Sequence, residues 1–555
     1  MSVAVVGAVG LGQYEEAAVI VVLFGIGEAM ESYGLQRSRH ALKRLIDHAP
    51  QTVQIKGQDL RTPVSEIPVG TMIAIKPGER VPLDGNVVFG TALVDEAAIT
   101  GEATPKTKLA GDTVYAGSIT SQGYLEVRTT TREQNTALHK IVELTYRAAE
   151  RKSRAQRFIE RFASIYTPGV MVAAVAIAVW GPVLGGLSWG MAIERALVLL
   201  VISCPCALVL STPVSVFSAI GHASQLGAVI KGGQFIEEMG RLTAIAFDKT
   251  RTLTKGQLAV TKIIPMPGFS EADVVACAAG MERFSEHPLA KGLMDYASRQ
   301  GWDPHHFTEF QAVAGKGLSG TCTICTDAHH CLGSLSFVSQ DHSVTEDVVK
   351  QVSALEAEGN TVLVMADANG VKGVIGLSDE IRPESKILID RLRHYHIVPM
   401  IVTGDNAAAA RFVGEHVGIL EIKAGLLPDE KEAFLRDQIL HYAHVGMVGD
   451  GINDAPALAA ASVGIAMGAV GSDVAIENAD IALMNDNLLV IADLVALGRR
   501  TVAMIRFNVL FAVMVKVVFV VAALWGVVHL ALAIFADVGV TIIVVLNGLR
   551  LYTSR

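Results

Sequence analysis

The sequence has little charge: only 18% of its 555 residues are Asp, Glu, Lys or Arg, whereas 51% are hydrophobic. This composition is too apolar for an ordinary soluble protein and indicates a membrane protein with a large soluble part. No long basic block occurs and the net charge is −9, which argues against nucleic acid as a partner. The six cysteines are few for this length, and two stand one residue apart, so the pattern is not a disulfide framework and fits a reducing cytoplasm.

The N-terminus lacks the basic n-region of a signal peptide, and its apolar segment 1–12 is too short to span a bilayer. Five other segments are long enough, some with polar interruptions: 17–34, 168–187, 196–220, 508–528 and 530–550. The basic stretches "LQRSRHALKR" and "LGRRTVAMIR" flank the first and fourth of these segments. By the positive-inside rule, the two large polar regions and the C-terminus are expected in the cytoplasm.

The two large polar regions differ in pattern. Residues 50–130 contain short runs of Val, Ile and Thr separated by turn residues, which predict a small β-rich domain. Residues 226–496 alternate helical segments with the apolar strands "LTAIAFD", "VIGLSD", "VPMIVTGD", "HVGMVGD" and "VGIAMG", which predict a doubly wound parallel sheet. An insert at 257–372, between the first two of these strands, is expected to form a separate lobe.

An aspartate follows each of three predicted strands, at Asp248, Asp405 and Asp450. Because ligands bind at the carboxyl ends of the strands in open α/β sheets, we expect these carboxylates to gather there. Their mutual repulsion calls for a cation, and Mg²⁺ is the natural partner of oxygen ligands. An aspartate can also be a nucleophile that forms an aspartyl phosphate, and Lys431 could neutralise the transferred phosphoryl group. One such Asp could merely cap a helix or turn, but three together indicate phosphoryl transfer.

The segment "VISCPCALVLSTP" places Cys204 and Cys206 on either side of Pro205. Proline inside a helix removes a backbone hydrogen bond, and a membrane tolerates such a break where the helix lines a cavity. Two thiols at the break predict a soft-metal site for Zn²⁺, Cd²⁺, Pb²⁺ or Cu⁺. The alternative is a pair of inert buried cysteines.

The last two apolar segments each contain one charged residue, Lys516 and Asp537. Each would cost about 2.5–3.5 kcal/mol at the centre of a bilayer, so unpaired burial is unfavourable. They could form a structural ion pair, or the lysine could reach the interface. They could also complete a divalent-metal site, in which Asp537 is an oxygen ligand and Lys516 compensates the carboxylate when the site is empty. A monovalent copper site would not need that carboxylate.

The motifs "TGEATP", "DKTRTLT", "TGDN" and "GDGINDAP", in this order, resemble those of P-type ATPases over nearly the whole chain. The resemblance implies a multidomain α/β membrane protein: a transmembrane helix bundle, a β-rich actuator domain, a Rossmann-like (haloacid-dehalogenase-like) phosphorylation domain and an α/β nucleotide-binding insert. The corresponding boundaries are 1–34 for incomplete N-terminal transmembrane helices, 35–155 for the actuator, 156–225 for the hairpin with Cys-Pro-Cys, 226–256 and 373–496 for the phosphorylation domain, 257–372 for the nucleotide-binding domain and 497–555 for the C-terminal hairpin.

The resemblance also implies roles for single residues. Asp248 matches the phosphorylated aspartate, and Asp248, Thr250 and Asp450 match the Mg²⁺ site. Glu102 matches the actuator glutamate that positions the hydrolytic water. The other matching catalytic positions are Thr100, Gly101, Lys249, Thr403, Gly404, Asp405, Lys431, Asn453 and Asp454.

Within the insert, "MERFSEHPLA" and "AGKGLSG" resemble the nucleotide pocket of the heavy-metal branch, which implies ATP contacts from Glu282, His287, Gly315 and Gly317. The stretch "CTICTDAHHC" has a spacing that could hold zinc. Because alternating side chains of a strand would scatter these ligands over two faces, we interpret them as incidental.

The Cys-Pro-Cys motif with Lys516 and Asp537 resembles the zinc/cadmium/lead-exporting branch of the heavy-metal P-type ATPases. This implies ATP-driven export of these ions by a monomeric pump in the bacterial plasma membrane, with catalytic domains in the cytoplasm. Glu28 could belong to the metal path or lie at the interface.

Two departures from the family pattern favour an alternative, a transport-impaired fragment or variant. Arg251 replaces a glycine beside the expected nucleophile, and "MSVAVVGAVGLG" resembles the middle of a core helix, as in an N-terminally shortened chain. A third departure, Ala103 in place of a serine, is expected to have only a modest effect. A soluble-type phosphatase of the same α/β fold is a further alternative, which the membrane segments argue against.

Overall fold

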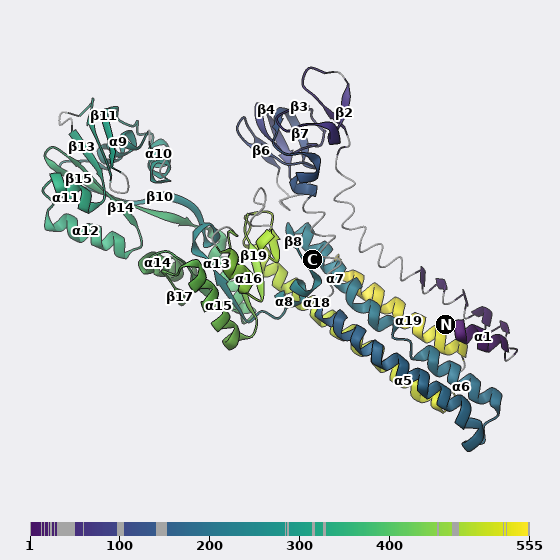
Figure 1. Cartoon of the computed structure of the whole chain (residues 1–555). Helices are drawn as coiled ribbons and strands as arrows, with labels where there is room; N and C mark the ends of the chain where they lie inside the picture. Colours follow the sequence, from purple (N-terminus) through teal and green to yellow (C-terminus); the bar gives the residue numbers. More distant parts are fainter. Residues whose placement is uncertain are drawn as a thin grey trace. The chain divides into compact units, whose positions relative to one another are not determined.

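A computed structural model gives the fold of the chain (Figure 1). The chain forms two compact units, Met1–Leu242 with Gly468–Arg555, and Thr243–Met467, and each is described by itself. The structure describes residues 2–10, 12, 14, 15, 17–19, 21, 22, 25, 26, 28, 29, 50, 52–58, 60–96, 105–139, 153–283, 285, 288–313, 317–325, 329–451, 454–468, 477–525, 527, 528 and 530–552.

The β-rich domain predicted near residues 50–130 is an antiparallel sheet with the strand order β3-β7-β4-β5, where β6 also pairs with β4. In β3, buried and half-buried side chains alternate, as expected for a sheet with one face on the core. The core includes Ile73, Leu83, Val87 and Leu125. The strands of this region are β1 (Thr52–Gln54), β2 (Arg61–Pro63), β3 (Met72–Ile75), β4 (Gly85–Asp95), β5 (Lys106–Lys108), β6 (Thr113–Val114) and β7 (Ile119–Thr129).

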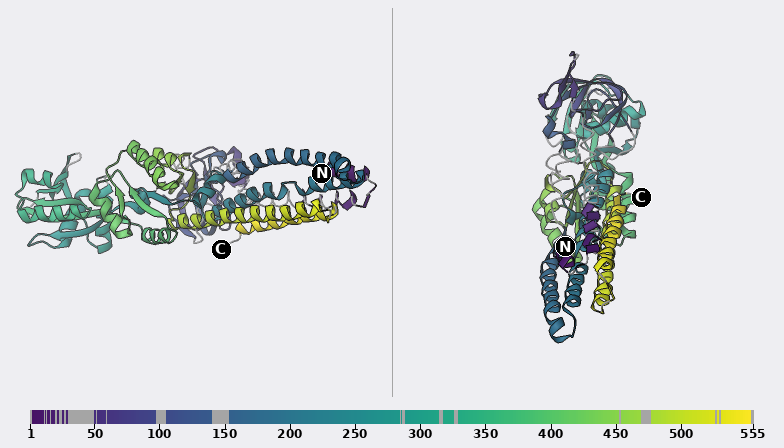
Figure 2. Two further views of the ribbon diagram at one scale, coloured as in Figure 1. Left: turned by 90° about the horizontal axis from the view of Figure 1, so that it is seen from below. Right: turned by 90° about the vertical axis from the view of Figure 1, so that its right-hand side faces the viewer.

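Long apolar helices form a bundle in the first unit, and they run side by side in all three views (Figures 1 and 2). They are α5 (Arg154–Leu184), α6 (Trp189–Ile202), α7 (Cys206–Gln225), α18 (Leu489–Leu524) and α19 (Leu530–Leu549). Among the described residues, four stretches are long and apolar enough to cross a membrane: Arg154–Leu184, Trp189–Gln225, Leu489–Ala523 and Ala531–Tyr552. The predictions at 168–187, 196–220, 508–528 and 530–550 are confirmed on that basis, whereas segment 17–34 lies partly outside the described residues. A short helix α1 (Ser2–Gly10) lies near the N-terminus.

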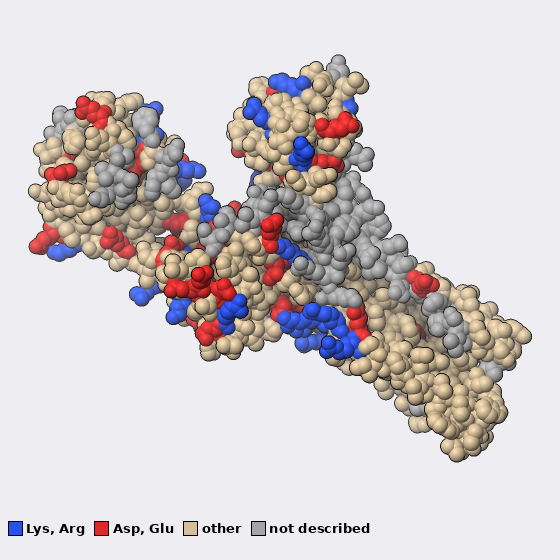
Figure 3. Space-filling model, in the orientation of Figure 1, with Lys and Arg blue, Asp and Glu red and all other residues tan. Residues whose placement is uncertain are grey.

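The face of the bundle that Figure 3 shows is mostly uncharged over its lower right part. Large apolar side chains such as Val172, Leu184, Leu510 and Val518 are exposed there. An exposed apolar surface of this extent is unfavourable in water and suits contact with lipid.

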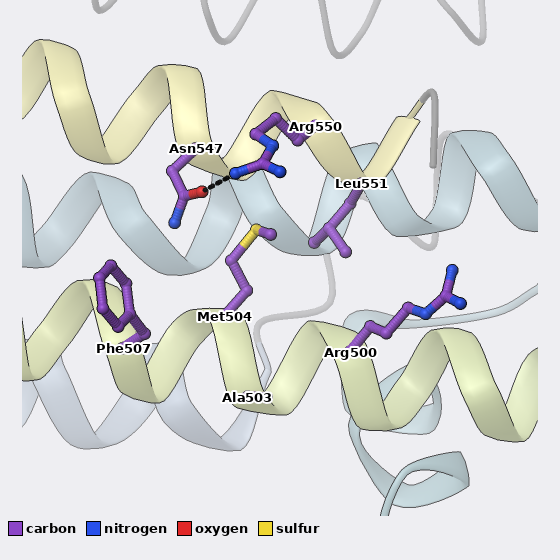
Figure 4. A pocket seen from close by; sticks show the side chains of 7 residues that line it. All are labelled: Arg500, Ala503, Met504, Phe507, Asn547, Arg550 and Leu551. Atoms are coloured by element: carbon purple, nitrogen blue, oxygen red, sulfur yellow. Dashed lines mark hydrogen bonds between the residues drawn. The ribbon is translucent and has the colours of Figure 1, made fainter. Parts of the chain in front are cut away.

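A pocket of about 650 Å³ lies between the middle of α18 and the C-terminal end of α19 with the helical turn that follows it (Figure 4). Two arginines, Arg500 and Arg550, belong to its lining, and the Arg550 guanidinium donates to the side-chain oxygen of Asn547 at 3.4 Å. The same unit contains α8 (Gly233–Met239), the short helical turn Arg550–Tyr552, and two antiparallel strands, β8 (Ala228–Ile230) and β20 (Ile481–Leu483).

The second unit contains the predicted parallel sheet. Its strands have the order β17-β16-β9-β18-β19, and the central strand β9 is buried at every residue. Burial on both faces is typical of parallel strands that helices cover. The strands are β9 (Ala244–Phe247), β16 (Val398–Val402), β17 (Glu421–Lys423), β18 (Val445–Gly449) and β19 (Val463–Ala466), and the helices are α13 (Pro383–His394), α14 (Ala407–Val417), α15 (Pro428–Tyr442) and α16 (Ala455–Ala460).

The insert is a lobe built on a six-stranded antiparallel sheet with the order β10-β15-β14-β13-β12-β11. Two separate hydrophobic cores pack on this sheet: one includes residues of α9 and α10, and the other includes residues of α11 and α12. The strands are β10 (Thr254–Pro265), β11 (Phe307–Val313), β12 (Gly317–Cys322), β13 (His329–Gly333), β14 (Thr361–Asp367) and β15 (Gly370–Ile381), and the helices are α9 (Glu271–Glu282), α10 (Pro288–Gln300), α11 (Leu335–Asp341) and α12 (Glu346–Ala357).

One strand prediction is wrong. The stretch "VIGLSD" was expected in the parallel sheet, but it lies in β15, which pairs antiparallel with β10 and β14 of the lobe. A continuous apolar run is buried in either sheet, so the run itself cannot indicate which sheet it joins.

Candidate phosphorylation site and membrane metal centre

Parallel strands bring the predicted carboxylates of the second unit to one edge. Strand β9 ends at Phe247, whose register partners are Ile401 of β16 and Val448 of β18. The backbone N–H of Asp248 then donates to the carbonyl of Val448 at 2.8 Å. Asp405 and Asp450 follow β16 and β18 in the chain, so all three predicted aspartates leave the sheet at the same end.

Asp248 is buried and forms an ion pair with Lys431. The Lys431 Nζ lies 2.8 Å from Asp248 Oδ1 and 2.7 Å from Asp454 Oδ1. Burial, helped by the neighbouring charge of Asp454, raises the pKa of Asp248 to about 7 against the opposing effect of Lys431. Burial also raises the pKa of Asp454, although the hydrogen bond from Lys431 opposes it. One ammonium group therefore serves two buried carboxylates.

A second lysine holds the loop after β16. The Lys249 Nζ lies 2.7 Å from Asp405 Oδ2. The hydroxyls of Thr250 and Thr403 donate to the same oxygen at 2.9 and 3.2 Å. Burial works to raise the pKa of Asp405, but the hydrogen bond and charge of Lys249 outweigh it and lower that pKa. Asp405 is thus ionised, and its carboxylate connects the loop after Asp248 to the loop that contains Thr403.

The carboxylates at this edge outnumber the ammonium groups. Asp450 adds a further negative charge, and its field helps to raise the pKa of Asp454. Carboxylate oxygens in excess of their counter-charge are the donor set that a hard divalent cation prefers. The residues present therefore fit Mg²⁺. Gly449 makes the close approach of Asp454 possible, because a Cβ at Gly449 would lie 2.5 Å from Asp454 Oδ2.

Arg251, three residues after Asp248, has φ +59° and ψ +2°. This is the left-handed region, which glycine adopts freely and most other residues avoid. The side chain of Arg251 is exposed and passes over Gly256, where an added Cβ would lie 2.4 Å from Arg251 Cγ. Arg251 therefore adopts the turn beside Asp248, but its left-handed backbone conformation costs free energy that a glycine at this position would not.

Asp379 is a residue that the sequence analysis missed. Its carboxylate accepts from the Thr254 hydroxyl at 2.5 Å and from the Gln257 N–H at 3.0 Å. These contacts join the two strands, β10 and β15, that connect the lobe to the parallel sheet. Burial raises the pKa of Asp379. The acidic end of "VIGLSD" was the available signal, but it had been assigned to the other sheet.

Several predicted residues lie outside the described part of the chain: Thr100, Gly101, Glu102, His287, Gly315 and Asn453. Of the predicted nucleotide contacts, Glu282 is buried at the end of α9 and Gly317 begins β12. A Cβ at Gly317 would lie 2.5 Å from the carbonyl of Leu332, so packing alone also requires a glycine there.

In the membrane bundle, the helix breaks where the sequence predicted it. Helix α6 ends at Ile202 and α7 begins at Cys206, with Pro205 between them. A potential ligand atom of Cys204, Cys206 and Asp537 lies within 4.8 Å of each of the others. The structure therefore brings these three predicted metal ligands together, from the α6–α7 break and from α19.

The expectation of two free thiols is wrong for the structure as it stands, because Cys204 and Cys206 form a disulfide. Their Cα atoms are 5.5 Å apart across the proline break, which is an ordinary separation for a disulfide. Because a thiolate, not a disulfide, is the metal ligand, only the reduced form of these cysteines offers sulfur ligands to a metal ion.

Lys516 of α18 contacts both Asp537 and the backbone at the helix break. Its Nζ lies 2.9 Å from Asp537 Oδ1 and donates to the carbonyl oxygens of Ile202, at 3.1 Å, and of Cys204. Those carbonyls are freed by the helix break, so the ammonium satisfies both the carboxylate and the open end of α6. Glu28 is exposed in the N-terminal helical segment and is not among the residues gathered here.

These two sites, the fold and the membrane helices define a membrane protein built on a phosphorylating hydrolase. Comparison with known proteins agrees: residues 242–462 match the haloacid dehalogenase-like hydrolase family, and residues 47–146 match the P-type ATPase actuator domain.

Similar proteins narrow the class. A probable cadmium-transporting ATPase of Listeria monocytogenes is 39% identical over 99% of this chain and 78% of its own length. The zinc/cadmium/lead-transporting P-type ATPase of Escherichia coli is 37% identical over 100% of this chain and 75% of its own. A crystal structure of a zinc-transporting PIB-type ATPase superposes with a TM-score of 0.69 at 36% identity, over 99% of this chain and 89% of that one. The chain therefore belongs to the P-type ATPases, within their heavy-metal-transporting branch, whose catalytic domains are cytoplasmic.

Proposed function

We propose that this chain exports a thiophilic divalent cation, Zn²⁺, Cd²⁺ or Pb²⁺, from the cytoplasm at the expense of ATP. The observation that carries the proposal is the Lys516–Asp537 pair at the Cys-Pro-Cys break, 2.9 Å between charged atoms. A divalent ion bound by two thiolates and a carboxylate leaves a net charge of −1, which the lysine offsets. Cu⁺ does not need the carboxylate, because two thiolates already exceed its charge.

Lys516 also supplies a reason for release. When the site is empty, its ammonium pairs with Asp537 and with the open carbonyls of α6, so the carboxylate is never left alone in the membrane. A departing metal ion is thus replaced by an internal cation.

ATP is the source of energy, and Asp248 is the acceptor of its terminal phosphoryl group. Lys431 orients Asp248 and offsets the charge of the phosphoryl oxygens, while Lys249, Thr250, Thr403 and Gly404 surround them, held in place by Asp405. Asp248, Thr250 and Asp450 would hold Mg²⁺, which would supply positive charge against the phosphate oxygens. Asn453 and Asp454 complete the edge of the site.

The remaining steps use the other domains, at the boundaries given above for the actuator (35–155) and the nucleotide-binding insert (257–372). Glu282, His287, Gly315 and Gly317 bind the nucleotide. Glu102, with Thr100 and Gly101, then activates water to hydrolyse the aspartyl phosphate. The pump acts as a monomer in a bacterial plasma membrane, without a nucleic-acid partner.

The test is ATP hydrolysis and ion uptake by the purified, reduced chain in lipid vesicles, with Zn²⁺, Cd²⁺, Pb²⁺ and Cu⁺ compared at matched free concentrations. We expect stimulation by the three divalent ions and their transport into inside-out vesicles. Stimulation by Cu⁺ with indifference to the divalent ions would refute the assignment.

A second function, metal and nucleotide binding with impaired turnover, is favoured by one observation, the positive φ of Arg251 beside the nucleophile. A bulky cation in this turn can slow phosphoryl transfer or retain phosphate. Metal binding at Cys204 and Cys206 with no metal-stimulated hydrolysis would support this function over export.

A further inference from the structure

A cluster of thiols and imidazoles lies inside the nucleotide-binding lobe, far along the chain from the membrane cysteines. It joins Cys277 of α9, His305 of the segment before β11, Cys322 at the end of β12, Cys325 in the following turn and His330 of β13. Cys277 and Cys322 are buried, whereas His305 and Cys325 are half-buried, so the cluster has one side open to solvent. Nothing in the proposed transport or phosphorylation chemistry uses these residues.

The separations of three of these donor atoms, from Cys277, His305 and Cys325, are close to the edge lengths of a zinc tetrahedron. With metal–sulfur bonds of about 2.3 Å and metal–nitrogen bonds of about 2.0–2.1 Å, tetrahedral ligand atoms lie about 3.6–3.8 Å apart. The Sγ of Cys277 lies 3.7 Å from that of Cys325 and 3.4 Å from His305 Nδ1. His305 Nδ1 lies 3.5 Å from Cys325 Sγ and 3.7 Å from Cys322 Sγ. Cys277, His305 and Cys325 therefore form a closed triangle, and Cys322 adjoins it beside His305 and within 4.8 Å of Cys325.

The backbone holds the donors in place before any ion arrives. The N–H of His305 donates to the carbonyl of Ala276 at 2.9 Å, next to Cys277. Gly280 allows this approach, because a Cβ there would lie 2.2 Å from the His305 carbonyl oxygen. The N–H of Cys325 points to Cys322 Sγ at 3.4 Å, so the turn "CTIC" already presents a donor to one sulfur. Such outer contacts orient metal ligands and raise affinity.

Charge balance favours three thiolates at this place. Lys372 of β15 is buried, and its Nζ lies 3.6 Å from Cys277 Sγ and 3.9 Å from Cys325 Sγ. A divalent ion with three thiolates and one neutral imidazole carries a net charge of −1, which this ammonium offsets. His330 lies on the lysine side, with Nε2 3.4 Å from Lys372 Nζ, and is better placed as an outer partner than as a fourth ligand.

We propose that Cys277, His305, Cys322 and Cys325 form a second soft-metal site, which takes Zn²⁺ or Cd²⁺ within the nucleotide-binding lobe. A donor set of three sulfurs and one nitrogen selects these ions over Mg²⁺ or Ca²⁺. The bound ion would link α9 to the β12–β13 turn, so that the stability of the lobe depends on the metal. The interpretation of "CTICTDAHHC" as incidental is replaced, because two further ligands come from outside that stretch.

The test uses the full chain, purified under reducing conditions, with the membrane site removed by C204S, C206S and D537N. Cd²⁺ is the probe, followed by equilibrium dialysis and by the ultraviolet thiolate-to-cadmium charge-transfer band. We expect one tightly bound Cd²⁺ per chain. Adding C325S, at a half-buried position, should weaken that binding by at least about tenfold.

The matched control is C331S. Cys331 is buried in the same lobe on β13, but it packs in the other core, with α11 and α12, away from the cluster. C331S should leave the stoichiometry and the band unchanged, while circular dichroism checks that both variants fold. H305Q, at another half-buried position, should repeat the loss seen for C325S without removing a thiol.

Three results would overturn the proposal. The first is no bound Cd²⁺ once the membrane site is removed. The second is equal binding by the C325S, H305Q and C331S variants. The third is a Cys277–Cys325 disulfide, detected by mass spectrometry in reduced preparations that retain no metal.

Discussion

The proposed phosphorylation site and the proposed membrane metal site both pair a lysine with an aspartate at nearly the same distance, 2.8 Å for Lys431–Asp248 and 2.9 Å for Lys516–Asp537. The surroundings differ. Lys431 serves two carboxylates, whereas Lys516 serves one carboxylate and two backbone carbonyls. The soluble site is left with excess negative charge, and the membrane site is left balanced.

This difference follows from the medium. At a strand end, water and dissolved cations can supply the missing positive charge when nucleotide arrives. In a bilayer an uncompensated charge is expensive, so the empty site must be neutral by itself. The surroundings of Lys431–Asp248 therefore favour the binding of a further cation, whereas the Lys516–Asp537 pair is stable without one. Four substitutions can break or sharpen this comparison.

The largest effect is expected for D248N. The amide cannot accept a phosphoryl group as a stable acyl phosphate, so phosphoenzyme formed from labelled ATP and metal-stimulated hydrolysis should both disappear. The matched control is D390N, which changes an exposed aspartate on α13 of the same unit. Acid-stable label that remains in D248N would place the nucleophile elsewhere.

The next effect is expected for D537N, which keeps the shape of the side chain and removes the charge. Metal-stimulated hydrolysis should fall by at least about tenfold, since even an outer partner of a metal site typically has such an effect. Phosphorylation from inorganic phosphate should persist, because the soluble site is intact. The control is T541V, one turn along α19, which loses a hydroxyl that donates to the Asp537 carbonyl. An equal loss in T541V would mean that helix packing, not the carboxylate, was disturbed.

K516M tests the balance directly. Removing one partner of a buried ion pair typically destabilises by about 3–5 kcal/mol, because the other charge stays buried. Bound metal can replace the missing cation, so Zn²⁺ or Cd²⁺ should raise the unfolding temperature of K516M more than that of the unmodified chain. Turnover should fall several-fold through slower release. K431M is the same change in the soluble site, whose carboxylates can take Mg²⁺ in place of the lysine. With Mg²⁺ saturating, added Zn²⁺ should therefore stabilise K431M no more than the unmodified chain, and equal stabilisation of K431M and K516M by Zn²⁺ would contradict this difference between the sites.

The parts of both sites that depend on short stretches of sequence could be predicted from the sequence. An apolar strand followed by Asp places the carboxylate at the sheet edge, as Asp248 shows. A proline between two cysteines predicts the helix break that the structure has between Ile202 and Cys206. Lys516 and Asp537 were recognisable as partners because a bilayer leaves few other ways to bury them.

Other parts depend on packing between distant segments. Cys277 and His305 join "CTIC" only because α9 lies on the sheet of the lobe, and no spacing in the sequence indicates this. Strand alternation did separate His330 from Cys331, as expected, yet it could not predict ligands contributed by a helix. Asp379 was missed for the related reason that its apolar strand could have joined either sheet.

The smallest effect is expected for R251G, and it concerns the turn next to the soluble pair. Arg251 and His396 are two non-glycine residues with positive φ, 59° and 56°, and both side chains are exposed. A non-glycine residue in this region costs on the order of 1 kcal/mol or more, so glycine at either place should raise the free energy of unfolding by about 1 kcal/mol. Only R251G also removes a fixed cation three residues from Asp248. Only R251G should therefore raise ATP turnover, by about twofold, which corresponds to a barrier lower by about 0.4 kcal/mol. Urea unfolding and steady-state ATP hydrolysis are measured for R251G and H396G. If both variants gain the same free energy of unfolding and only R251G hydrolyses ATP faster, the faster hydrolysis is due to the loss of the charge. If both variants hydrolyse ATP faster, it is due to the gain in stability. Unchanged turnover in R251G would make the arginine a tolerated residue, and the excess negative charge of the soluble site would then be set by its carboxylates and two lysines alone.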